Sequence, residues 1–187
     1  METICTWATS SELMKEYHNN EWGIPSFDDR YLFEMLVLEG AQSGLSWSII
    51  LKKRNAYREA FHQFNIDECA NLTDLELEHI KENTEVVKHM QKIRSVRSNA
   101  IAIQKVRSEF GSFANFIWEF VNKKPIISNH TSISEVPAES DLSIKVSKEL
   151  KRRGFKFIGP VTTYSFLQAI GVIDDHIIHC PYHSMNR

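Results

Sequence analysis

The chain has 187 residues, of which 42% are hydrophobic and 25% are charged, and its formal net charge is −2 at pH 7. This length and composition suffice for one substantial hydrophobic core, or for two small helical lobes that share an interface. The near-neutral charge excludes a histone-like polycation and a disordered acidic chain, so any nucleic-acid binding has to come from local patches.

The first residues contain no basic segment followed by an apolar one, and no run in the sequence is long enough to span a bilayer. We therefore expect a cytoplasmic protein without a membrane partner. The three cysteines, Cys5, Cys69 and Cys180, are an odd number in a chain without a secretion signal. This disfavours a disulfide framework and leaves thiols free to bind metal, with Cys69 expected to be a small core residue.

Helical periodicity recurs along the chain, while strand-like alternation is scarce and glycines and prolines are few, so we predict an all-α protein. Two expected capping boxes, Thr9 with Glu12 and Thr73 with Glu76, mark helix starts. In chain order, the expected helices span roughly residues 9–18, 26 or 28 to beyond 39, 46–64, 73–83, 84–109 and 113–121.

The last third of the chain predicts a loop followed by two helices. Residues 122–137 contain two prolines and many Ser, Thr and Asn residues, as is typical of a long loop. An amphipathic helix over residues 141–153 is expected to end at Gly154, and Gly159-Pro160 begins a further helix that closes at Gly171. This part of the sequence therefore predicts a helix, a hairpin and a helix.

Four residues of metal-ligating types lie near the two ends of the chain: Cys5, His18, His176 and Cys180. The last two are four residues apart and would share one face if the chain were helical there. Two thiolates and two imidazoles complete a tetrahedral zinc site with no position for water, so the metal would be structural. The spacing leaves open that these residues are unrelated, or that His179 or His183 replaces His176.

Glu39 lies on the same face of its predicted helix as Leu32, Met35 and Leu36, so its carboxylate projects toward the core or into a pocket. An ionised carboxylate in that place needs a partner. A buried Lys or Arg, a turn of the side chain toward solvent at the helix end, or a cationic ligand would each satisfy it.

Large aromatic residues are expected close to this carboxylate. Trp47 follows a turn of small residues directly after the helix of Glu39, and Trp7, Tyr17 and Trp22 lie near the predicted zinc ligands. Together they could sandwich a flat cationic ring by stacking and by cation–π attraction. Ordinary core packing is the commoner role of any single Trp and stays open as the alternative.

Positive charge concentrates just before the predicted hairpin, at Lys145, Lys148, Lys151, Arg152, Arg153 and Lys156. The exposed N–H groups at the start of the helix after Gly159 can hold a phosphate without reading base identity. A run of charge also fits a solvated helix face, which is the alternative here.

Taken together, these residues resemble the bacterial 3-methyladenine DNA glycosylase I family, a zinc-clipped branch of the helix-hairpin-helix DNA glycosylases. The similarity covers nearly the whole chain and runs through residues 5–7, 17–23, 32–35, 38–40, 44–47, 152–159, 164–166 and 175–176. So many matches in order are far more specific than any one of them. One departure from the pattern expected of the family is Met14, where a Tyr would stand.

The resemblance implies a role for each candidate residue. One structural zinc ion would be held by Cys5, His18, His176 and Cys180. Glu39, as the catalytic residue, and Tyr17 would hydrogen-bond a flipped base, Trp47 would stack on it, and Trp7 and Trp22 would shape the pocket. Gly44 and Leu45 would probe the gap in the duplex, while the hairpin from Gly154 to Val161, with Lys156 and Gly159, would grip the DNA backbone.

The resemblance also implies a monofunctional hydrolase of base-excision repair, which acts as a monomer on double-stranded DNA containing alkylated adenine and frees 3-methyladenine. N3-alkylated adenine is cationic on the sugar and leaves as a neutral molecule, so extraction of the base and stabilisation of charge by Glu39 would suffice. Asp174 and Asp175, beside His176, are expected to support the zinc end. We expect a single domain over residues 1–187, with a hairpin lobe over roughly 38–135 and a lobe of the termini and zinc over roughly 1–37 and 136–187.

Two other functions compete with this one. In a zinc-dependent hydrolase the metal would activate water and would need an open coordination position. A non-catalytic, zinc-containing helical DNA-binding module would use the hairpin alone, and it would leave Glu39 and the aromatic residues without a task.

Overall fold

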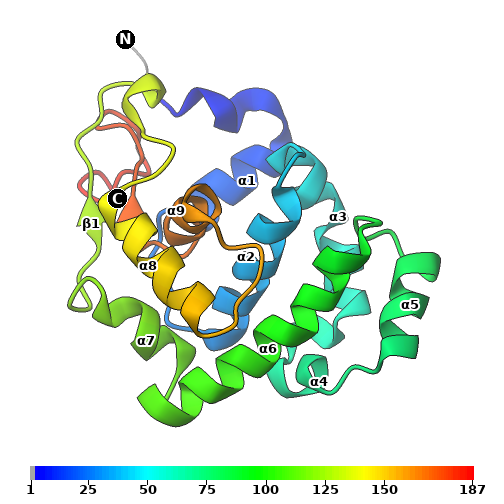
Figure 1. Cartoon of the computed structure of the whole chain (residues 1–187). Helices are drawn as coiled ribbons and strands as arrows, with labels where there is room; N and C mark the ends of the chain where they lie inside the picture. Colours follow the sequence, from blue (N-terminus) through cyan, green and yellow to red (C-terminus); the bar gives the residue numbers. More distant parts are fainter. Residues whose placement is uncertain (1–2) are drawn as a thin grey trace.

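The computed structural model describes residues 3–187 and is built mainly of helices (Figure 1). The α-helices are α1 (Glu12–Asn20), α2 (Asp29–Gln42), α3 (Trp47–Ala60), α4 (Ile66–Ala70), α5 (Asp74–Asn83), α6 (Met90–Phe110), α7 (Phe113–Glu119), α8 (Asp141–Arg152) and α9 (Pro160–Ala169). The 3-10 turns are η1 (Thr6–Ser10), η2 (His62–Phe64) and η3 (Ile133–Glu135). Two short strands, β1 (Ile126–Ile127) and β2 (Ile173–Asp174), pair in parallel. Within the described residues, no helix is both long and apolar enough to cross a bilayer.

Several predicted helix ends are confirmed by their caps. The capping box of Thr73 and Glu76 opens α5, with the Thr73 hydroxyl accepting from the Glu76 N–H and the Glu76 carboxylate accepting from the Thr73 N–H. Gly111 (φ +86°) ends α6 and Gly154 (φ +91°) follows α8, both in backbone conformations that side chains with a Cβ rarely adopt. Pro160 is the first residue of α9, as the sequence predicts.

The predicted start of the first helix and the predicted start at residue 84 are wrong. Helix α1 begins after Ser11, whose hydroxyl accepts from the Met14 N–H, while Thr9 lies in the preceding 3-10 turn. Helix α6 begins only at Met90, because a ring nitrogen of His89 accepts from the Lys92 N–H and caps it there. Histidine is not among the usual capping residues, so the pattern gave no signal at this point.

The predicted third helix is also too long. Helix α3 ends at Ala60, and the residues that follow, His62 to Phe64, all have positive φ values between 52° and 57°. Three left-handed residues in succession cannot continue an α-helix. The short helix α4 begins after them, capped by Asn65, and was not predicted.

Helix α2 is the central helix of the fold, because every residue from Leu32 to Ala41 is buried. The buried hydrophobic side chains of the protein form one connected cluster around it. A helix buried on all sides carries little amphipathic pattern, and this one includes two carboxylates, those of Glu34 and Glu39.

Glu34 is held by arginines. The guanidinium of Arg54 donates from Nε to Glu34 at 2.8 Å and from both terminal nitrogens to Glu21 at 2.8 Å. The Nε of Arg58 donates to the same Glu34 oxygen at 2.7 Å. This network ties the end of α1 to α2 and α3, and it satisfies the buried charges that compose it.

Helix α6 fixes the two turns that flank the end of α2. The ammonium group of Lys92 donates to the carbonyl oxygens of Ala41 at 3.0 Å and Ser43 at 2.8 Å, which caps the C-terminus of α2. Two helical turns further on, the buried amide of Asn99 accepts from the Lys156 N–H at 2.8 Å and donates to its carbonyl oxygen at 3.2 Å. The α2–α3 turn and the hairpin between α8 and α9 are therefore anchored to one helix.

The hairpin also packs directly on α2. A Cβ atom at Gly40 would lie 3.2 Å from the carbonyl oxygen of Phe157 and 3.3 Å from its Cβ. Glycine therefore lets the two backbones approach closely, because a Cβ atom at this position would push Phe157 away by a few tenths of an ångström. Phe157 itself has a φ of +55°, so the tip of the hairpin adopts a left-handed conformation where it meets the helix.

We expect Asn99→Ala to lower the free energy of unfolding by about 1–3 kcal/mol, because it leaves the N–H and C=O groups of Lys156 without their partners. Urea denaturation measures the change. Asn83→Ala, which removes an exposed amide at the end of α5, serves as the control and should change stability little. Equal stability of the two variants would show that Asn99 does not anchor the hairpin.

Candidate functional site

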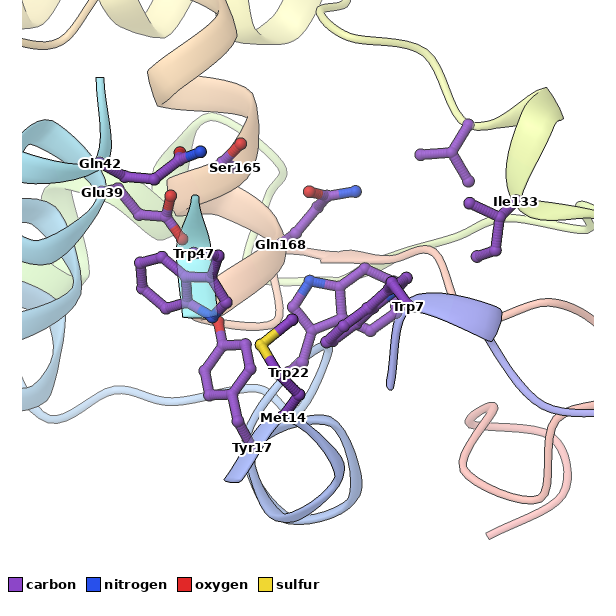
Figure 2. A pocket seen from close by; sticks show the side chains of 11 residues that line it. Trp7, Met14, Tyr17, Trp22, Glu39, Gln42, Trp47, Ile133, Ser165 and Gln168 are labelled. Carbon is purple, nitrogen blue, oxygen red and sulfur yellow. The ribbon is translucent and has the colours of Figure 1, made fainter. Parts of the chain in front are cut away.

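A pocket of about 350 Å³ opens beside the C-terminal half of α2 (Figure 2). Its walls come from η1, α1, the segment after α1, α2, the start of α3, α9 and the loop around η3. It is lined by Trp7, Met14, Tyr17, Trp22, Glu39, Gln42, Trp47, Ile133, Val136, Ser165 and Gln168.

Aromatic rings form most of the pocket wall. The rings of Trp7 and Trp22 meet edge to face with centroids 5.0 Å apart, and those of Tyr17 and Trp47 are tilted with centroids 5.3 Å apart. In Figure 2 the first pair lies on one side of the pocket and the second pair, with Glu39, on the other. The structure therefore brings the predicted aromatic set together around a pocket that ring faces and edges line.

Glu39 is buried in this pocket, with 5% of its surface exposed, and it makes no hydrogen bond or ion pair to any described residue. None of the described side chains that line the pocket carries a positive charge. Burial alone raises the pKa of Glu39 to about 8. Arg54 and Arg58 pair with Glu34, so the alternative of a buried ion pair applies to Glu34 and not to Glu39.

Two further polar atoms of the pocket lack partners. The hydroxyl group of Tyr17 and the indole Nε1 of Trp47 are buried and have no hydrogen-bond partner in the structure. Burial, together with the nearby negative charge of Glu39, raises the pKa of Tyr17 well above its usual value, so the phenol remains a donor. Buried polar atoms without partners are rare, and at a pocket they indicate a ligand with matching groups.

Sequence reasoning missed five of the lining residues: Gln42, Ile133, Val136, Ser165 and Gln168. The last two carried a weak signal, because they are polar positions three residues apart in the last half of α9, whose other residues there are apolar. Ile133 and Val136 reach the pocket from the long loop after α7, and no local pattern predicts such a contact.

The residues predicted to contact nucleic acid lie on the two turns that α6 anchors. Gly44 (φ +80°) lies in open space, and Leu45 next to it has 36% of its surface exposed. On the hairpin, Lys156 is exposed, and Val161 in the first turn of α9 is 53% exposed. The N-cap of α9, Gly159, offers no side-chain cap, so the first N–H groups of this helix are free for an external acceptor.

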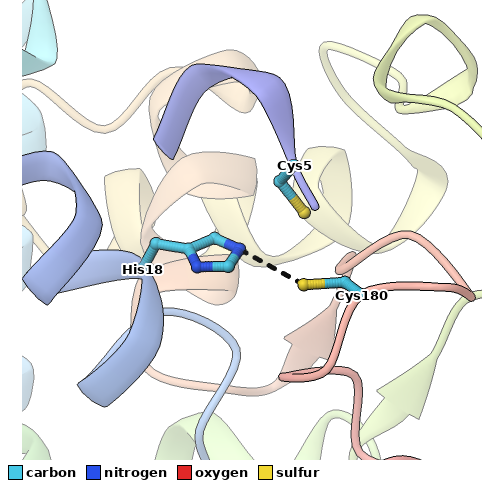
Figure 3. Close-up of side chains that lie close together, drawn as sticks. All are labelled: Cys5, His18 and Cys180. Carbon is cyan, nitrogen blue, oxygen red and sulfur yellow. Dashed lines mark hydrogen bonds between the residues drawn. The ribbon is translucent and has the colours of Figure 1, made fainter. Parts of the chain in front are cut away.

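A second candidate site joins the two ends of the chain (Figure 3). Cys5, His18 and Cys180 are fully buried, and one donor atom from each lies within 4.8 Å of the other two. His18 Nε2 is 3.6 Å from the Cys180 sulfur. A hydrogen bond from the Cys5 thiol lowers the pKa of Cys180, with a smaller contribution from His18, which favours the thiolate form of Cys180. This donor set fits a metal ion.

His176, the fourth predicted ligand, lies outside this group. Its ring packs edge-on against the ring of His18 at a centroid distance of 4.6 Å, and its Nε2 is 3.4 Å from the His18 carbonyl oxygen. The carboxylate of Asp174 holds its Nδ1 at 2.7 Å. The condition under which His176 and Cys180 would share a helix face is not met, because the chain forms turns there after β2. A shared helix face is therefore not what brings Cys180 to the site.

The two neighbouring aspartates have different roles. Asp174 binds His176 and so supports the end of the chain that carries Cys180, as expected. Asp175 instead accepts hydrogen bonds from Tyr164, Gln168 and Ser128, which lie on α9 and in the loop after α7. The expectation that both aspartates serve the metal end is wrong for Asp175.

Comparison with known proteins shows one consistent relationship. Residues 7–183 match the family model for methyladenine glycosylase. The chain is 42% identical over 181 residues to the DNA-3-methyladenine glycosylase of Haemophilus influenzae, an alignment that covers 97% of this chain and 98% of the relative. It is 40% identical over 183 residues to DNA-3-methyladenine glycosylase 1 of Escherichia coli, covering 98% of each. The fold is similar, with a TM-score of 0.94 and 36% identity, to a variant of 3-methyladenine DNA glycosylase I solved in complex with 3-methyladenine, covering 97% and 98% of the two chains.

The burial of Glu39 leads to a prediction about stability. Because the pKa of Glu39 rises from 4.5 to about 8 on folding, the folded state retains a proton that the unfolded state loses between these pH values. The free energy of unfolding should therefore fall as pH rises from 4.5 to 8, by up to about 1.4 kcal/mol per pH unit, and Glu39→Gln should remove this loss.

Urea denaturation of the wild type and of Glu39→Gln at pH 5, 6, 7, 8 and 9 measures the effect. Titrations of other groups cancel in the difference between the two proteins. The variant should become progressively more stable than the wild type up to about pH 8, with no further change above it. A difference that stays constant over this range would contradict a desolvated, unpaired carboxylate.

Proposed function

The chain belongs to the methyladenine glycosylase family, and from this premise we propose that it hydrolyses the N-glycosidic bond of 3-methyladenine in alkylated DNA, as an enzyme of base-excision repair. The observation that carries the proposal is the carboxylate of Glu39, buried without a counter-ion in a pocket lined by aromatic rings. An N3-alkylated adenine is flat and positively charged. Its ring can stack on the aromatic side chains, and its charge can pair with the carboxylate that has no counter-ion.

The charge state of Glu39 supports selection of the damaged base. In the empty pocket a pKa of about 8 keeps most of the carboxyl groups protonated at neutral pH. A cationic base shifts Glu39 to the ionised form and pairs with it, whereas an undamaged adenine has no charge with which to stabilise the carboxylate. Alkylated and normal bases of almost equal shape are thereby distinguished by charge.

Cleavage of the glycosidic bond needs few further groups from the protein. As the bond between N9 of the base and C1′ of the sugar breaks, the electron pair stays with the base, which departs as neutral 3-methyladenine. The positive charge moves to the sugar, close enough for Glu39 to stabilise it, and a water molecule adds to C1′ and loses a proton. Among the described residues that line the pocket there is no lysine to form a covalent intermediate, which supports a monofunctional hydrolase.

The two exposed turns are suited to hold the DNA while the base is out of the helix. We assign Gly44 and Leu45 to the gap that a flipped nucleotide leaves, and the free N–H groups at the start of α9, with Lys156, to a backbone phosphate. Flipping costs a few kcal/mol, and the contacts of these turns help to offset it.

We also propose one structural zinc ion, bound by Cys5, His18, Cys180 and, as the fourth ligand, His176. The two imidazoles support this assignment, because Asn19 holds Nδ1 of His18 and Asp174 holds Nδ1 of His176. The metal would then bind Nε2 of His18, and Nε2 of His176 in place of its 3.4 Å contact with the His18 carbonyl oxygen. The metal would supply no chemistry to the reaction and would only join the two ends of the chain.

The competing functions fit the structure less well. A zinc-dependent hydrolase needs a coordination position open to water, but Cys5, His18 and Cys180 are fully buried. A non-catalytic binding module gives no role to a pocket with an unpaired carboxylate and two unpaired donors. The repair glycosylase accounts for both features.

We expect the protein to release 3-methyladenine, and not 7-methylguanine, from methylated duplex DNA, as measured by chromatography of the free bases. Glu39→Gln should fold but lose excision about 100-fold or more, because it removes the charge that faces the cationic base. Glu78→Gln, the same exchange on the exposed face of α5, should leave the rate unchanged. Full activity in Glu39→Gln, or release of neither base by the wild type, would overturn the assignment.

Metal content tests the zinc proposal separately. Elemental analysis of purified protein should find one zinc ion per chain, and Cys180→Ser should lose most of it along with thermal stability. Cys69→Ser provides the matched control, since Cys69 is equally buried but bonds only to the Phe61 carbonyl oxygen, and its zinc content should match the wild type. Equal zinc in both variants would refute the site.

A further inference from the structure

Gln168 on α9 presents a polar group to the pocket from a side chain that is held in one orientation. The residue is 9% exposed and lines the pocket. Its amide nitrogen donates to the Oδ2 atom of Asp175 at 2.8 Å. The Oδ2 atom of Asp175 accepts this hydrogen bond, and only the NH₂ end of an amide can donate one, so that end faces Asp175. The carbonyl oxygen of Gln168 is thereby turned away from Asp175.

Asp175 is itself fixed by the surrounding structure. It is fully buried, and besides Gln168 it accepts from the hydroxyl group of Tyr164 at the same oxygen and from that of Ser128 at the other. Three donors therefore converge on this carboxylate, and each removes part of its freedom to turn. The orientation of Gln168 follows from a network behind the pocket wall and does not depend on any ligand.

The carbonyl oxygen of Gln168 has no hydrogen-bond partner among the described residues. In Figure 2 it lies at the end of the side chain nearer to Glu39 and Ser165, and the nitrogen lies at the other end. A fixed acceptor in a partly desolvated pocket favours a ligand that offers a donor at that point. A ligand that offers a second acceptor there leaves both groups unpaired and is rejected.

Few donors are available on the base that this enzyme acts on. When adenine is methylated at N3 and joined to the sugar at N9, its N–H donors are the two hydrogens of the exocyclic amino group. Because there are two, the amino group can satisfy Gln168 as well as Glu39. A 6-oxo purine presents a carbonyl oxygen at the same position.

We propose that Gln168 is a specificity-determining residue, which accepts a hydrogen bond from the exocyclic amino group and so selects 6-amino over 6-oxo purines. This inference rests on the proposed function, because it concerns the base that occupies the same pocket. It adds to the selection by charge: Glu39 distinguishes alkylated from normal bases, and Gln168 distinguishes alkylated adenine from an alkylated base with an oxygen at C6.

The test combines one protein variant with one change in the ligand. Binding of 3-methyladenine and of 3-methylhypoxanthine, its 6-oxo counterpart, is measured by calorimetry for the wild type and for Gln168→Met, which keeps the length of the side chain. We expect the wild type to prefer the amino base by at least about 10-fold and the variant to lose most of that preference. An unchanged ratio of affinities in Gln168→Met would overturn the proposal.

A control variant separates recognition from general disturbance. Tyr164→Phe removes a different donor from Asp175 and leaves the Gln168 carbonyl in the pocket, so the preference for the amino base should persist. If Tyr164→Phe lowered the preference as much as Gln168→Met, the effect would not belong to Gln168 and the proposal would fall.

The affinities of the wild type for the two bases also test the proposal without any variant. Equal affinity of the wild type for the two bases would overturn the proposal even if Gln168→Met did not fold. If the wild type released 3-methyladenine from DNA but showed no such preference, the role of Gln168 would fall while the glycosylase function stood. If the wild type did not release 3-methyladenine from DNA, the proposed function itself would be contradicted.

Discussion

The structure depends on one unfavourable group, a carboxylate buried without a counter-ion. Helix α2 is buried along its whole C-terminal half, and it places Glu39 where burial raises the pKa to about 8. The arginines of α3 bind Glu34, five residues earlier on the same helix, and none of the described residues that line the pocket of Glu39 is cationic. Such an arrangement costs stability in the free protein, and a cationic ligand is the natural compensation.

Around this group, the elements that would meet DNA are held at fixed distances from the pocket. Lys92 and Asn99 attach the α2–α3 turn and the hairpin to one side of α6, and the backbone contact between Gly40 and Phe157 fixes the hairpin one residue after the carboxylate. Under the proposed function, a base would reach Glu39 only while the two turns hold the DNA backbone, so a fixed distance between the turns and the pocket would help to position the base. The hydrogen bonds of Lys92 and Asn99 hold backbone groups of the two turns, so they fix the turns and leave the side chains of these turns free to face the DNA.

The sequence predicted the elements that carry local signals and missed what depends on distant contacts. The Thr73 capping box and the glycines after α6 and α8 were read correctly, because caps are local chemistry. The start of α6 at His89 was not, since a ring nitrogen serves as the cap there. Glu39 was found through the helical pattern and the aromatic set through its positions in the chain, and the family resemblance then gave them roles. The role of Gln168 could be inferred only once the fold placed Asp175 behind it. For the same reason, the sequence left open how Cys180 reaches the metal site, and the structure shows that turns, not a helix, place it there.

The two candidate sites share their framework, which explains why a group of metal donors lies beside a base pocket. Tyr17 and His18 are neighbours on α1, and because successive helix residues point about 100° apart, one faces the pocket and the other faces Cys180. The ring of Trp7, two residues after Cys5, packs edge-on against both His18, at 5.2 Å, and Trp22, at 5.0 Å. Closure of the two chain ends therefore also sets the aromatic wall that a flipped base would meet. A metal with no part in the chemistry would in this way still control the shape of the slot in front of Glu39.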